Sequence, residues 1–149
     1  MANAAAICTS FKQEQLNGIH ALGSTVVRAA STADAFKAAL FSSTATLGAA
    51  TTAYSATNEV SGAGYTAGGV SFVWIAPNVS GTTAFTTPST SFSWSGLTAS
   101  SFDAVLLYNA TQGNKALGVY TFGSQSVTAG NFSLTMPTND SATGLLRVA

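Results

Sequence analysis

Alternating apolar and polar residues predict short β-strands along most of this chain. The segment SFSWSGL at 91–97 alternates strictly, with Phe92 and Trp94 on one face and serines on the other. FDAVLLYN at 102–109 is almost continuously apolar, a pattern typical of a strand buried on both faces. VSFVWI at 70–75 is rich in the β-branched and aromatic residues that favour strands.

Further segments show similar patterns and complete the expected fold. They are AFKAALFS at 35–42, KALGVYTF at 115–122, SQSVTAG at 124–130, NFSLTMP at 131–137 and GLLRVA at 144–149. The polar residues 111–114 lie between two apolar runs and indicate a β-hairpin. About eight short strands with frequent turn signals predict an all-β fold, an antiparallel β-sandwich of the jelly-roll kind.

The N-terminal region has a different pattern. Residues 11–22 place Phe11, Ile19 and Leu22 at helical spacing and predict a short α-helix, with Gly18 near its end. The small, largely apolar residues 1–10 are interpreted as an arm that orders on a neighbouring subunit. The whole chain, 1–149, is expected to be a single domain whose β-sandwich covers 35–149.

A glycine-rich segment matches a nucleotide-binding motif in letters only. Gly62-Ala-Gly64-Tyr-Thr-Ala67 fits G-x-G-x-x-G/A, a motif that requires a following helix and an acidic residue about 20 positions later. Here a predicted strand follows, and the next acidic residue is Asp103. The glycines are therefore interpreted as a sharp corner entering that strand, after an irregular surface connection at 46–60.

Composition changes the picture mainly through charge. Only 7% of the residues are charged, where about 25% is usual. Five basic and five acidic residues cancel, and the basic ones are scattered, so no nucleic-acid surface is expected. Free monomers usually keep a charged surface, so this neutral chain is expected to work inside an assembly.

The sequence offers little material for catalysis or cofactor binding. There is one histidine, His20, and one cysteine, Cys8, and metal sites normally take three or four ligands. A Cys8–His20 dyad would lack an orienting partner, and Cys8 is interpreted as an ordinary thiol. The carboxylates are dispersed, at Glu14, Asp34, Glu59, Asp103 and Asp140. We therefore expect no enzyme activity, no catalytic or metal site and no cofactor.

Sugar binding and membrane insertion are two further functional classes on which the sequence bears. Four aromatic residues provide candidates for a sugar-binding face, although such residues are usually core in a sandwich: Tyr65, Trp74, Trp94 and Tyr108. No apolar run is long enough to span a membrane, and the N-terminus lacks a basic leader, so a soluble protein made in a cytoplasm is expected.

Four stretches resemble a family of small structural proteins of tailed bacteriophages. They are MANAAAICTSFKQEQLNGIHALG at the start, TTAYSATNEVSGAGYTAGGV at 51–70, FDAVLLYNAT at 102–111 and LTMPTNDSATGLLRVA at the end. The resemblance implies a component of a virion assembled in the bacterial cytoplasm. Size and composition favour a capsid decoration (cement) protein that binds the major capsid protein as a dimer or trimer. A neck, tail or baseplate component is the nearest alternative, and a host-glycan-binding module is a more distant one.

Overall fold

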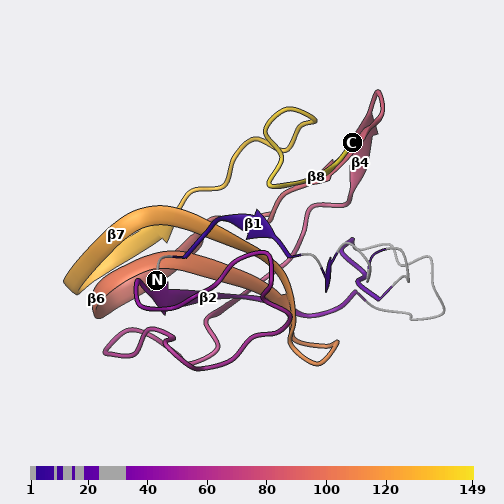
Figure 1. The fold of residues 1–149 in the computed structure, drawn as a ribbon. Helices are drawn as coiled ribbons and strands as arrows, with labels where there is room; N and C mark the ends of the chain where they lie inside the picture. Colours follow the sequence, from indigo (N-terminus) through magenta and orange to yellow (C-terminus); the bar gives the residue numbers. More distant parts are fainter. Residues whose placement is uncertain (1–2, 9, 12–14, 16–18, 24–32) are drawn as a thin grey trace.

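The structure, a computed structural model, describes residues 3–8, 10–11, 15, 19–23 and 33–149 (Figure 1). The strands are β1 (Ala6–Ile7), β2 (Phe36–Ser42), β3 (Val70–Phe72), β4 (Asn78–Ser80), β5 (Thr83–Thr86), β6 (Phe92–Asn109), β7 (Lys115–Leu134) and β8 (Leu146–Val148). All strand pairings are antiparallel, so the predicted all-β class is confirmed.

The strands form two sheets of unequal size. The larger has the order β1-β7-β6-β2-β3, and the smaller has the order β4-β5-β8. Figure 1 shows the small sheet projecting from the long β6–β7 pair, with the C-terminus on it. The predicted C-terminal strand therefore exists, and it is fixed in this second sheet through pairing with β5.

The β6–β7 hairpin dominates the molecule, and it is strongly bent. Phe122 and Phe132 both belong to β7, and ten residues of straight strand would span about 33 Å. Their ring centroids are nevertheless only 5.3 Å apart. Phe132 also meets Phe102 of β6 edge to face at 5.0 Å. The hairpin thus curves back over itself, as the two arcs in Figure 1 show. Aromatic rings fill its concave side.

β-Bulges explain the bending. The β6–β7 register shifts repeatedly between Trp94 and Ala104. Residues with positive φ occur here in both strands, at Gly96, Ser101, Gly123 and Ala129. Bulges of this kind bend a strand and increase its twist.

The bulges also explain why the apolar pattern predicts more strands here than the structure contains. Segments 91–97 and 102–109 were predicted as separate strands, as were 115–122, 124–130 and 131–137. In the structure they are two continuous strands, β6 and β7, that end at Asn109 and Leu134. The breaks in the apolar pattern mark changes of strand direction, since each coincides with a bulge.

Most of the core lies on β2, the second half of β6 and the first residues of β7, where most side chains are buried. The largest completely buried side chains include Phe36, Phe41, Phe102, Leu106 and Leu107. The apolar segments predicted at 35–42 and 102–109 are therefore central strands. The irregular connection predicted at 46–60 is also confirmed, because it contains bends, turns and isolated bridges only.

The N-terminal predictions have mixed outcomes. Half of the predicted helix at 11–22 falls outside the described residues, and residues 19–22 at its end are not helical. Of the predicted arm, residues 3–8 pack on their own chain: β1 pairs with Gly118 and Val119, and the Ala4 N–H donates to the Leu47 carbonyl. Residues 3–8 therefore have partners within their own chain, and ordering of the arm on a neighbouring subunit stays a prediction.

Candidate functional site

The glycine-rich loop is a close-packed corner between strands. Gly62, Gly64 and Gly69 have φ of +143°, +73° and +76°. A β-carbon at these positions would overlap the carbonyl oxygens of Thr98, Gly96 and Ala38, respectively. The loop leads directly into strand β3, so a strand follows it and not a helix. The structural interpretation of the G-x-G-x-x-A motif is confirmed.

A glutamate–tyrosine cluster holds this corner against the large sheet. The Glu59 carboxylate accepts hydrogen bonds from the hydroxyls of Tyr54 and Tyr65 and from the Gly68 N–H, each at 2.7 Å. The Tyr65 hydroxyl in turn accepts the Leu40 N–H of β2 at 3.0 Å. Charge-assisted hydrogen bonds are stronger than neutral ones, so Glu59 fixes the loop geometry.

Tyr108 of β6 completes the cluster. Its hydroxyl donates to the Gly68 carbonyl at 2.8 Å, and its ring stacks on that of Tyr54 with centroids 4.6 Å apart. Burial, and then the hydrogen bond to Glu59, raise the pKa of Tyr54 and of Tyr65; burial raises the pKa of Tyr108. All three phenols are therefore protonated donors at neutral pH, which suits a structural role better than acid–base chemistry.

A second polar network lies at the hairpin end of β6. Asn109 is completely buried, and its Nδ2 lies 2.8 Å from Asp34 Oδ2 and 2.9 Å from His20 Nδ1. Its Oδ1 accepts the backbone N–H groups of Thr111 and Gln112 at 3.1 Å. Because Nδ2 can only donate, the Nδ1 atom of His20 accepts. The network ties the turn after β6 to the N-terminal region.

The remaining candidate residues are dispersed along the chain, and those that the structure describes each contact a neighbouring group. Asp103 accepts the side-chain amide of Asn3, and the pKa of Asp140 is lowered because the N–H groups of Thr143 and Ala142 donate to it. Glu14 lies outside the described residues, which contain no group of three possible metal ligands. The Cys8 thiol is buried, 3.9 Å from the Gly48 carbonyl oxygen.

The aromatic residues considered for sugar binding belong to the interior. Trp74, Trp94 and Tyr108 are buried, and Tyr65 is half-buried with its hydroxyl held by Glu59. Trp94 lies against Phe132 inside the bent hairpin. These rings therefore present no exposed stacking face.

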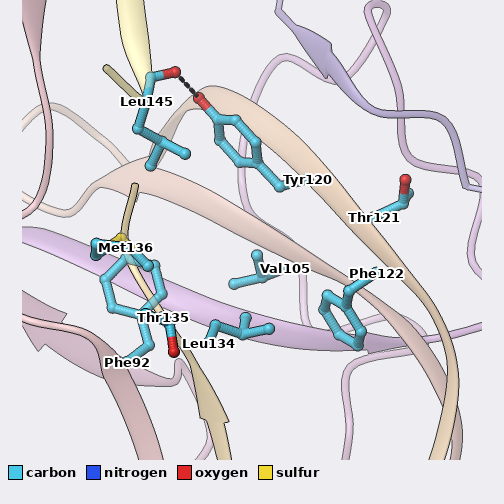
Figure 2. Close-up of a pocket in the computed structure, with 9 residues that line it drawn as sticks. All are labelled: Phe92, Val105, Tyr120, Thr121, Phe122, Leu134, Thr135, Met136 and Leu145. Atoms are coloured by element: carbon cyan, nitrogen blue, oxygen red, sulfur yellow. Dashed lines mark hydrogen bonds between the residues drawn. The ribbon is translucent and has the colours of Figure 1, made fainter. Parts of the chain in front are cut away.

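Figure 2 shows an apolar pocket of about 130 Å³ on the concave side of the hairpin. Its lining consists of Phe92, Val105, Tyr120, Thr121, Phe122, Leu134, Thr135, Met136 and Leu145. The Tyr120 hydroxyl donates to the Leu145 carbonyl at 3.0 Å, which ties the C-terminal segment to β7. No lining residue is charged, and the polar groups of the lining are the hydroxyls of Tyr120, Thr121 and Thr135.

The outer surface of the long hairpin is the most distinctive exposed feature. The fully exposed positions of β6 and β7 hold only Ser, Thr, Gly, Ala and Asn. The two strands contain one charged residue each, Asp103 and Lys115. The result is a large neutral surface rich in hydroxyl groups.

The projecting small sheet carries an exposed apolar row. Val79 of β4 is opposite Ala84 of β5, which is opposite Val148 of β8. Val79 and Val148 are 64% and 63% exposed, high values for large apolar side chains. The hairpin at 78–86 was not predicted, although Gly81 between NVS and TAFT is a turn signal.

Comparisons with known proteins give no assignment: no family model, no curated protein and no solved structure matches this chain. Within the described residues, no helix is long and apolar enough to cross a membrane. The features that bear on function are thus the neutral hairpin surface and the apolar row.

Proposed function

We propose that this chain is a structural protein of a tailed-bacteriophage virion, and specifically a decoration protein bound to the major capsid protein on the outside of the head. The observation that carries the proposal is the neutral, hydroxyl-rich outer surface of β6 and β7. A surface without charge repulsion suits dense packing of identical copies. The resemblance of four sequence stretches to small phage structural proteins supports the same role.

The proposed mechanism is mechanical and needs no chemistry. Each bound copy bridges neighbouring capsid subunits, and the exposed Val79–Ala84–Val148 row supplies apolar contact. Binding to the intact shell alone stabilises that shell by mass action. The barrier to rupture by the internal DNA pressure rises accordingly. No catalytic residue, metal, cofactor, nucleic acid or membrane takes part in this mechanism.

The bent hairpin supports a finer description of the fold. We infer that its two facing halves make the chain a β-sandwich, related to the jelly-roll type found in viral proteins. Phe92 and Phe132 of one half pack against Phe72 and Phe102 of the other layer, with centroids 5.1 and 5.0 Å apart. The rings between the halves serve as the sandwich core.

The nearest alternative is a neck, tail or baseplate component, which would use the same neutral surface. Separating purified particles into heads and tails and quantifying the chain in each distinguishes the two positions. We expect the chain to copurify with heads, with the major capsid protein and a tail-tube protein as markers. Recovery with tails alone would contradict the decoration role and favour the alternative.

A further inference from the structure

The outer edge of β7 is long and open. One side of β7 pairs with β6 along the strand, whereas among the described strands only β1 pairs on the other side, at Gly118 and Val119. Residues 120–134 therefore have no strand paired on this side within the described part of the chain. Figure 1 shows the arc of β7 continuing well beyond β1.

This edge lacks two of the usual protections against pairing, charged side chains and proline. Natural edge strands carry charged side chains or proline, which discourage addition of another strand. No charged residue occurs between Lys115 and Asp140, and the first proline after Lys115 is Pro137. Bulges at Gly123 and Ala129 interrupt the edge and leave the segment SQSVT at 124–128 between them. The register shift opposite Gln125 and Val127 comes from an extra residue on β6, between Ala99 and Phe102.

We propose that residues 124–128 pair antiparallel with the same residues of a second copy of this chain, about a two-fold axis at Ser126. In such a contact Ser124 faces Thr128 of the other copy, and Gln125 faces Val127. A charged edge would meet its own charge across the axis, but this neutral edge does not. Facing Ser and Thr side chains can also hydrogen-bond across the pair.

The lengths of the available edges favour a second copy of β7 as the partner of β7. The strands at the edges of the two sheets are short: β1 has two residues, and β3, β4 and β8 have three residues each. On β6, the half beyond β2 is covered by the glycine-rich loop, whose Ala63 carbonyl accepts the Thr98 N–H. Within the described chain only β7 offers a length that matches β7, so the two-fold pairing satisfies both copies equally.

This inference deepens the proposed decoration role, which includes a homo-oligomer, by naming its interface. Five paired residues form a small contact, so we expect a weak dimer in solution. If the proposed function holds, crowding of copies on a shell raises their effective concentration and strengthens the pairing. The solution dimer itself can be tested without particles.

The test is a concentration series of the full chain by sedimentation velocity. The double variant Ser124→Lys/Thr128→Lys places lysines opposite each other twice across the axis, at exposed positions, and is expected to weaken dimerisation about tenfold. The control Ser93→Lys/Ser100→Lys adds the same charge at exposed positions of β6 and should dimerise like the original chain. Far-ultraviolet circular dichroism checks that each variant is folded.

A charge-swap experiment makes the test specific. Mixing the lysine variant with Ser124→Glu/Thr128→Glu should restore pairing, because opposite charges then face each other. A monomer at all concentrations, or equal weakening by the β6 control, would overturn the inference. Neither result would affect the proposed function, because that function is tested by the presence of the chain in purified particles. If the chain dimerises in solution but is missing from particles, the proposed function is wrong and the proposed interface still holds.

Discussion

Replacing Gly69 with alanine is expected to lower the free energy of unfolding by about 4 kcal/mol. Gly69 has φ of +76°, and a β-carbon there would overlap the backbone of Ala38 in β2. The substitution therefore combines an unfavourable left-handed conformation with a steric clash that must displace a central strand. Unfolding in urea, followed by the fluorescence of the buried Trp74 and Trp94, measures the loss.

Gly81→Ala is the matched control for this prediction. Gly81 has a similar φ of +60°, but no atom lies within 4 Å of an added β-carbon. Only the conformational cost applies there, about 1 kcal/mol. Equal losses in the two variants would show that the close packing of the glycine-rich loop on β2 does not stabilise the fold.

Replacing Asn109 with alanine is expected to lower the free energy of unfolding by about 3 kcal/mol. The variant leaves Asp34 Oδ2 without its amide donor and removes the acceptor for the Thr111 and Gln112 N–H groups. Since Asn109 is fully buried, water does not replace these partners at the same position. The midpoint and slope of urea unfolding give the change in free energy.

Asn131→Ala serves as the control, because Asn131 is exposed and makes one long hydrogen bond of 3.4 Å with the Gly96 N–H. The free energy of unfolding of this control variant should fall by less than about 0.5 kcal/mol. If Asn109→Ala proved as mild as this control, the buried network would not be the anchor of the β6–β7 turn.

The strand segments could be predicted from the sequence because burial imposes a local pattern. The alternation around Phe92 and Trp94 and the apolar run at 102–109 both reflect the side of the chain that faces the core. A local pattern does not show how the backbone continues from one segment to the next. Bulges at Ser101 and Ala129 were therefore read as strand ends, since neither residue is a glycine that would signal positive φ.

The polar networks could not be predicted for a different reason. Asn109 and His20 are 89 residues apart and meet only because the chain folds. Glu59 was counted among dispersed carboxylates, although Tyr54 and Tyr65 on either side of it in sequence were an available signal. The interpretation of the glycines succeeded because the strand that follows them is itself visible in the sequence.

The carboxylates in the described part of the chain serve structural contacts. Each carboxylate among Asp34, Glu59, Asp103 and Asp140 accepts hydrogen bonds from neighbouring groups that position a loop or turn. The exposed positions of the hairpin carry no charge, and two of their hydroxyl groups, on Thr98 and Ser126, accept backbone N–H groups at the bulges. We propose that contact with other protein copies accounts for the neutral composition of this surface.

The copy number of this chain in purified particles tests the central claim most directly. Quantitative mass spectrometry would give the ratio of this chain to the major capsid protein. The decoration role predicts one copy per capsid subunit or a simple fraction, such as one half or one third. A ratio of only a few per cent, or no chain in the particles, would contradict it.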